Sequence, residues 1–241
     1  MRPWLVGGES WVESREDACA FGLEAPCAWP GCGIVQSAVG NDCSPTRNDK
    51  TRRDFMNETL KVIRDRRSIR AFRDEQLKPD EVDAIVDAGL YAPSASNAQN
   101  LRYTIIQNKG LIERTAKWVV DEIDRIGNEY LKQLVARTGG HIFRNAPTVF
   151  IISSETKDRF GIVNAAAAIE NMLLAAESLG IGSCWIGMLA VLAGSPRVNE
   201  YAAELQIPEG FSPQFGVTFG YKVSANPEAP VRNRDIISYI R

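Results

Sequence analysis

The stretch from Gly161 to Leu179 constrains the fold of this chain more than any other segment. Its body is apolar and rich in alanine, from Ala165 to Ala168 and again from Met172 to Ala176. This composition favours a long helix with little polar surface around its circumference. Such a helix needs other parts of a protein around it, so we expect it at the centre of a core or in a subunit interface.

The pattern after Phe55 alternates between helices and short strands. Periodicity and capping residues predict helices over residues 58–65, 79–90, 111–136 with an interruption near Gly127, and 196–205. Runs rich in β-branched residues predict strands over 103–107, 148–153, 183–188 and 215–221, and a terminal strand or short helix is expected over 235–240. Long helices with scattered strands favour an α+β sandwich over a regular series of βαβ units. The sequence contains no GxGxxG dinucleotide-binding motif after a strand.

Composition changes near Phe55 and divides the chain into two parts. Before it, Gly, Pro, Ser, Trp and Cys follow one another without a regular period, and Thr46 to Asp54 is polar and charged. We therefore expect residues 1–55 to be a poorly ordered N-terminal extension and residues 56–241 to form the compact domain, with Met56 as a candidate natural start. The extension lacks the paired C-x2-C spacing of zinc and iron–sulfur sites, so no metal centre is expected from its four cysteines, Cys19, Cys27, Cys32 and Cys43.

Charge and hydropathy exclude several classes of function. The chain has 241 residues and a formal net charge of −2, whereas binding to nucleic acid or to an anionic membrane needs a basic surplus. No apolar run reaches the roughly 18 residues of a membrane span, and residues 1–30 lack the pattern of a secretory signal, so we expect a cytoplasmic location. The single histidine, His141, lies in a turn-like stretch and is expected to be structural.

A compact cluster of arginine and serine follows the first predicted helix, in the run Arg66-Arg67-Ser68-Ile69-Arg70. Arginine presents a planar fork of donors that matches the geometry of a phosphate group. The cluster is therefore a candidate anion cradle. A solvated, charged helix end remains the alternative for the cluster taken alone.

Three further polar stretches stand out, although each also has a purely structural interpretation. Residues 93–99 form a loop of small and amide side chains that a ligand could approach closely. Residues 182–188 form a strand that ends in Gly187 beside aromatic and sulfur side chains. Residues 229–234 place Arg232 and Arg234 close to the C-terminus. Taken alone, these are a capped loop, a core strand and a solvated tail.

Together these stretches resemble the nitroreductase family of flavoproteins, over Asn57 to Arg241. The resemblance rests on the order and spacing of its motifs more than on any one of them. They are the runs 66–72, 92–100, 165–168, 170–176, 179–187, 219–222 and 230–232. Residues 1–55 have no counterpart in the family pattern.

The resemblance implies a three-layer α+β sandwich with a central mixed or antiparallel sheet flanked by helices. It also implies a domain-swapped homodimer that binds FMN without a covalent link at the dimer interface. The first cluster would hold the phosphate and ribityl chain, the loop would come from the partner subunit, and the strand end would lie along the isoalloxazine. Arg232, or Arg234 in its place, would be a second phosphate clamp. The implied cofactor-binding residues are Arg66, Arg67, Ser68, Arg70, Pro93, Ser94, Asn97, Gln99, Cys184, Ile186, Gly187, Arg232 and Arg234.

The activity implied is hydride transfer from NAD(P)H to a nitroaromatic, a quinone or a similar small-molecule acceptor by a ping-pong mechanism. No side chain is expected to act as a catalytic nucleophile, because the flavin carries the chemistry. The alternatives are a flavin-destroying or dehalogenating enzyme of the same fold and a non-enzymatic flavin-binding protein. Two positions depart from the family pattern: Asn100 replaces a frequent proline, and Glu170 replaces the usual glutamine on the long helix.

Overall fold

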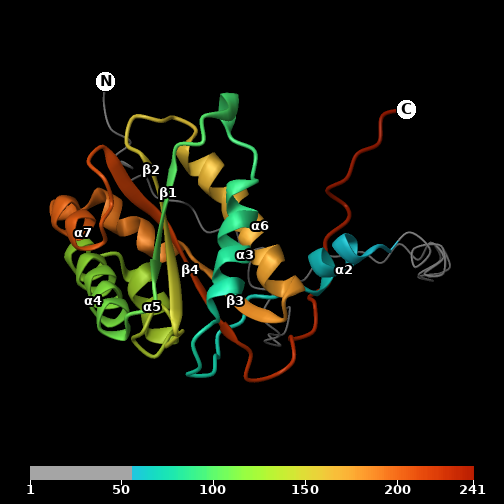
Figure 1. Cartoon of the computed structure of the whole chain (residues 1–241), viewed down its shortest axis with the longest axis horizontal. Coiled ribbons are helices and arrows are strands. Elements are labelled where there is room, and N and C mark those ends of the chain that lie inside the picture. The colour runs from blue at the N-terminus through green and yellow to red at the C-terminus, as the bar shows by residue number, and fades with distance from the viewer. Residues whose placement is uncertain (1–55) are drawn as a thin grey trace, which may run out of the picture. The chain divides into compact units, whose positions relative to one another are not determined.

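The computed structural model describes residues 56–241 (Figure 1). Residues 1–55 lie outside this range, and so do the four cysteines of the predicted extension. The structure therefore does not test the prediction of an extension or of Met56 as the natural start. In the described part, no helix is long and apolar enough to cross a membrane.

A four-stranded antiparallel sheet forms the centre of the domain. Its strands are β1 (Leu101–Ile106), β2 (Thr148–Glu155), β3 (Ile181–Ile186) and β4 (Phe211–Tyr221), in the order β1-β2-β4-β3. The inner strand β2 is buried from Thr148 to Ser154, as its β-branched residues predict. The expected antiparallel α+β sheet is therefore confirmed.

Helices cover both faces of this sheet (Figure 1). Side chains alternate between the faces of a strand, and on β2 Phe150 and Ile152 belong to one hydrophobic cluster, Val149 and Ile151 to the other. The first cluster includes residues of α3 (Pro79–Leu90) and α6 (Gly161–Ser178). The second includes residues of α4 (Lys109–Ile126), the 3-10 segment η3 (Gly187–Gly194) and α7 (Val198–Glu204), and is flanked by α5 (Glu129–Arg137). This arrangement is the predicted three-layer sandwich.

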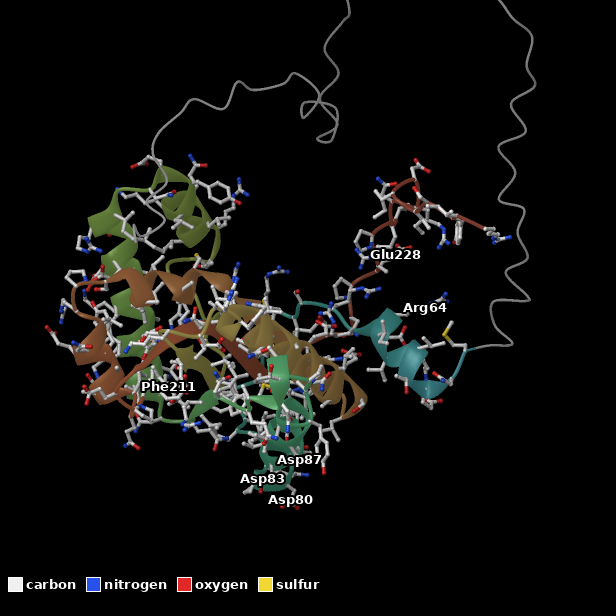
Figure 2. All side chains as sticks on the ribbon, turned by 90° about the horizontal axis from the view of Figure 1, so that it is seen from above. Arg64, Asp80, Asp83, Asp87, Phe211 and Glu228 are labelled. Atoms are coloured by element: carbon white, nitrogen blue, oxygen red, sulfur yellow. The ribbon has the colours of Figure 1, made fainter. Side chains whose placement is uncertain are left out.

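The long apolar helix α6 lies in the core, as predicted. Ala165, Ile169 and Met172 are fully buried, and the amide of Asn171 donates a hydrogen bond of 3.0 Å to the carbonyl of Ala88 on α3. The outer side of α3 is acidic and exposed, and Figure 2 shows Asp80, Asp83 and Asp87 along it.

Capping residues set the bounds of α4 and α5. Asn108 begins α4, where its side chain accepts a hydrogen bond from the N–H of Leu111, and Gly127 ends it with a left-handed φ of 72°. Asn128 then caps α5 in the same way as Asn108 caps α4. The predicted interruption near Gly127 is therefore confirmed, and two helices replace the single long one.

The terminal strand or short helix expected over 235–240 is wrong. After β4 the chain forms only an isolated bridge at Lys222 and a turn at residues 235–236. The apolar side chains of this segment find no cover within the described part of the chain, and Val231 and Ile240 are 98% and 100% exposed. A strand or helix this short is not stable without a surface on which to bury its apolar side chains.

Candidate functional site

The arginine cluster follows α2 (Glu58–Asp65) and runs along the edge of the sheet. The N–H of Ile69 donates a hydrogen bond of 2.8 Å to the carbonyl of Ser183 on β3, and Ser68 forms a parallel bridge with Ser183. Gly182 makes this approach possible, because a Cβ there would lie 2.9 Å from Cγ2 of Ile69. The main chain therefore fixes the cluster beside the predicted strand end.

The side chains of the arginine cluster make different contacts. Nε of Arg66 lies 3.6 Å from a carboxylate oxygen of Glu170 on α6. Arg67 turns back and donates to the carbonyls of Arg64 and Arg66, at 2.7 and 2.6 Å. Arg70 is exposed and donates a longer hydrogen bond of 3.3 Å to the carbonyl of Ser68. Arg67 thus stabilises the end of α2, while Arg66 and Arg70 keep donors for a ligand.

Arg70 and the end of β3 line one cavity of about 510 Å³. Apolar side chains from α5 and η3 form much of the rest of its wall. A Cβ on Gly187 would meet no atom within 4 Å, so the chain leaves open space there. The lining residues are Arg70, Leu131, Leu134, Arg137, Thr138, Ile142, Arg144, Cys184, Trp185, Ile186, Gly187, Met188 and Val191.

The electrostatics of Cys184 show which charges face this cavity. The thiol is buried, and burial raises its pKa. The positive charges of Arg70, Arg144 and Arg66 oppose that shift without cancelling it, and so does a hydrogen bond with Ser68. A neutral thiol therefore lies within the field of three guanidinium groups, and Cys184 forms part of the cavity wall.

A buried carboxylate supports the η3 wall of the cavity. Glu122 on α4 is 2% exposed and accepts hydrogen bonds from the hydroxyls of Ser195 and Tyr201, at 2.7 and 2.9 Å. Nε of Arg125 donates to it at 2.6 Å. Burial raises the pKa of Glu122, but the hydrogen bonds from Ser195, Arg125 and Tyr201 outweigh burial and lower it overall. The ionised carboxylate therefore joins α4 to the segment that follows η3.

The predicted loop at residues 93–99 is ordered by its own side chains. Oγ of Ser94 accepts a hydrogen bond from the N–H of Gln99 at 3.1 Å, and the Gln99 amide donates to Asn97 at 3.0 Å. The N–H of Ala95 donates to Asn164 near the start of α6. Pro93, Asn97 and Gln99 are exposed. The loop contacts α6 near its start, at Asn164, whereas α2 lies beside its later residues, such as Leu174 and Ser178. In one chain the loop and α2, which leads into the arginine cluster, therefore lie along different parts of α6.

Arg232 and Arg234 lie on the exposed C-terminal segment, which extends away from the sheet (Figure 1). Nearer to β4, hydrogen bonds attach the segment to the rest of the domain. The amide of Asn226 donates to a Glu177 carboxylate oxygen and to the carbonyl of Asp65, each at 2.7 Å. In the described part of the chain neither arginine forms an ion pair. The structure of one chain therefore leaves both side chains free at the surface.

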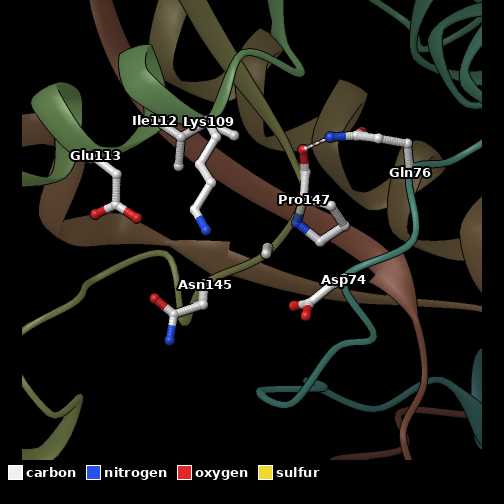
Figure 3. Close-up of a pocket in the computed structure, with 8 residues that line it drawn as sticks. Asp74, Gln76, Lys109, Ile112, Glu113, Asn145 and Pro147 are labelled. Carbon is white, nitrogen blue, oxygen red and sulfur yellow. Dashed lines mark hydrogen bonds between the residues drawn. The ribbon is translucent and has the colours of Figure 1, made fainter.

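A second cavity, of about 480 Å³, has a different character (Figure 3). Lys109 points into a space bounded by Asp74, Glu113 and Asn145, and the amide of Gln76 donates a hydrogen bond of 3.0 Å to the carbonyl of Pro147 at its edge. Its charges are mixed, and none of the residues predicted from the sequence lines it. His141 is nearby, with Nε2 3.0 Å from a Glu113 carboxylate oxygen, so it has a structural partner.

Comparison with known proteins assigns the family. The sequence profile described as the Nitroreductase family matches residues 63–221, well over half of the chain. The chain belongs to the nitroreductase family. Among curated relatives, a putative NADH dehydrogenase/NAD(P)H nitroreductase of Archaeoglobus fulgidus is 30% identical over 172 residues, which cover 69% of this chain and 86% of that protein. An FMN reductase (NADPH) of Bacillus subtilis is 27% identical over 190 residues, 73% of this chain and 70% of that protein.

Nitroreductases of known structure share the fold. The crystal structure of a nitroreductase with bound FMN from Bacteroides fragilis superposes with a TM-score of 0.71 at 32% identity, covering 77% of this chain and all of that one. Sequence reasoning had placed the arginine cluster and the strand end in one site, and the structure does bring these together. Arg137 and Arg144 also line the cavity, from α5 and the turn after it, and the sequence motifs do not include these two residues.

Proposed function

We propose that this chain is an FMN-dependent oxidoreductase that passes electrons from NAD(P)H to a nitroaromatic, a quinone or a similar small acceptor. The observation that carries the proposal is the cavity between Arg70 and the strand end Cys184–Gly187. Membership of the nitroreductase family and the FMN named for the Bacteroides fragilis structure support it.

The residues present fit the flavin. An isoalloxazine ring is flat and aromatic, and Ile186, Met188 and Val191 give the cavity an apolar wall. The open space at Gly187 lets a ring approach the main chain. Guanidinium groups suit both the phosphate and the negative charge that a reduced flavin carries. Among the described residues, none that lines the cavity carries a carboxylate to oppose those charges.

Each predicted residue then has a role in binding. Arg66 and Ser68 would hold the phosphate and ribityl chain, and Arg70 would face the ring from within the cavity. The main chain from Cys184 to Gly187 would lie along the isoalloxazine. Arg67 would support this arrangement through the end of α2, since its donors already bond to carbonyls there.

When bound, FMN would supply the hydride-transfer and electron-transfer chemistry between a nicotinamide and a second substrate. The protein positions the ligands and excludes water from the ring. One exchange site would serve donor and acceptor in turn, which makes the kinetics ping-pong. The sequence has no GxGxxG dinucleotide-binding motif, which is consistent with a nicotinamide cofactor that binds this site transiently and then dissociates.

A homodimer would complete the site. The loop with Pro93, Ser94, Asn97 and Gln99 would reach the flavin of the partner subunit, and Arg232 or Arg234 would supply the second phosphate clamp after exchange of the C-terminal segments. Two features of the surface support assembly. A groove of about 380 Å³ between α2, α3 and α6 is lined largely by apolar atoms, and α6 exposes Ile162 and Val163 by 57% and 63%. Exposed apolar surface of this kind marks an interface.

The first test is retention of FMN by the purified protein. Loss of a charge-assisted phosphate contact should cost about 1.5–3 kcal/mol of FMN affinity, so Arg66→Ala and Arg232→Ala should each raise the FMN dissociation constant at least tenfold. Arg114→Ala is the control, because Arg114 pairs with Glu204 and neither residue lines the cavity. Unchanged FMN retention in both variants would refute the phosphate assignment. A flavin that is consumed during turnover would favour the flavin-destroying alternative, and a bound flavin that NAD(P)H never reduces would favour a non-enzymatic binder.

A further inference from the structure

Three arginines line the proposed flavin cavity, and the flavin assignment uses only one of them. Arg70 belongs to the cluster assigned to FMN. Arg137 is the last residue of α5, and Arg144 lies in the turn between α5 and β2. The family pattern seen in the sequence includes neither of these two. Their positive charges line the cavity without an assigned partner.

The main chain holds Arg144 at the cavity by a conformation that is rare for its residue type. Arg144 and Asn145 both have left-handed φ angles, of 56° and 54°. Residues other than glycine keep such angles only where the surroundings enforce them, and they concentrate at functional sites. The enforcement is visible here, because the preceding Ile142 and Phe143 are fully buried.

The side chain of Arg144 is also linked to the main chain of Arg137. Nη1 of Arg144 donates a hydrogen bond of 3.2 Å to the carbonyl of Arg137, which orients the Arg144 side chain along the end of α5. Its charge acts on the Cys184 thiol inside the cavity. Arg144 is half-buried and Arg137 exposed, so one guanidinium lies at the wall and the other at the rim.

We propose that Arg137 and Arg144 form an anion-binding subsite for the ligand that exchanges over the flavin. The apolar side chains beside them, Leu131 and Leu134, favour a ligand with a flat apolar body and an anionic substituent. Two sources offer that chemistry: an acceptor that carries a carboxylate, and the phosphates of the nicotinamide donor. This inference rests on the proposed FMN site, since it concerns the second ligand at that site.

The test uses the FMN-loaded protein and measures equilibrium binding through the change in the visible spectrum of the flavin. Two probes of nearly equal shape are 4-nitrobenzoate, which is anionic, and 4-nitrobenzyl alcohol, which is neutral. NADP⁺ and NAD⁺ form the second pair. The variants are Arg144→Gln, Arg137→Gln and Arg144→Lys, with Arg114→Gln as the control on α4.

Losing a charge-assisted contact should weaken binding of the anion about tenfold or more in Arg144→Gln. The neutral probe should bind as before, and Arg144→Lys should recover part of the loss. A loss confined to 4-nitrobenzoate identifies an acidic acceptor as the natural ligand. A loss confined to NADP⁺ identifies the 2′-phosphate, and an equal loss for both dinucleotides identifies the pyrophosphate.

Equal affinities in all variants would overturn the subsite while leaving the FMN assignment intact, and so would an equal loss for the anionic and neutral probes. A protein that binds no FMN would refute the proposed function and this inference together. The two failures are therefore distinguishable, because FMN content is measured before any probe is added.

Discussion

Replacing Glu170 by glutamine should tighten the binding of FMN. The Glu170 carboxylate lies 3.6 Å from Nε of Arg66, the residue proposed to hold the phosphate. Before the phosphate can bind, Arg66 has to leave this pair or share its charge. The phosphate would also be repelled by the carboxylate. Glutamine has nearly the same shape and removes both effects.

The structure sets the size of the effect. The Arg66 and Glu170 side chains are 24% and 50% exposed, so water screens the pair. An ion pair with this exposure contributes at most about 1 kcal/mol, close to the Coulomb energy of two unit charges about 4 Å apart in water. The dissociation constant for FMN should therefore fall by up to about fivefold.

The assay is a titration of flavin fluorescence quenching at low and high salt. Riboflavin is the internal control, because it lacks the phosphate and should bind equally to both proteins. Glu204→Gln is the matched protein control, since Glu204 is 42% exposed and pairs with Arg114. The gain should shrink as salt screens the charges. An unchanged affinity for FMN, or an equal gain for riboflavin, would refute the reasoning.

Two further predictions concern the supports of the site. Glu122→Ala should destabilise the protein by about 1–3 kcal/mol, because it leaves the buried hydroxyls of Ser195 and Tyr201 without their acceptor. Thermal unfolding should show this as a midpoint lowered by about 2–4 °C per kcal/mol, and a loss below 1 kcal/mol would contradict the role of the network. Since the folded-state pKa of Glu122 lies below its ordinary 4.5, its contribution is present above that pH and is lost as the pH falls through the folded value. The stability gap between wild type and Glu122→Gln should accordingly narrow in acid. Gly182→Ala should cost about 1–3 kcal/mol and weaken FMN binding, because its Cβ would press on Ile69. Gly194→Ala meets no atom within 4 Å and should leave denaturant unfolding and FMN affinity nearly unchanged, and equal effects of the two alanines would disprove the positioning role of Gly182.

Much of the fold follows from local pattern. The alanine-rich run of α6 and the β-branched run of β2 each have a strong compositional signal, and both elements lie in the core as predicted. Gly127 ends one helix because only a glycine adopts its φ easily. Residues 235–240 mislead because their isoleucine and tyrosine side chains are typical of a strand, although the described part of the chain provides no neighbouring strand for them.

The site is predictable only in part, for a physical reason. The arginine cluster and the strand end are each local motifs, and the main-chain contact between Ile69 and Ser183 joins them. Arg144 lies at the same cavity because Ile142 and Phe143 before it are buried. No motif or spacing in the sequence indicates that Arg144 is close to Cys184. Contacts of this kind depend on tertiary structure and escape a motif.

The most direct test of the proposed function is anaerobic mixing of the FMN-loaded protein with NADH and with NADPH. If the proposed function is right, at least one nicotinamide bleaches the yellow flavin in a single turnover, and a quinone or nitroaromatic added afterwards restores the colour. A protein that binds FMN and keeps its oxidised spectrum with both nicotinamides would contradict the account.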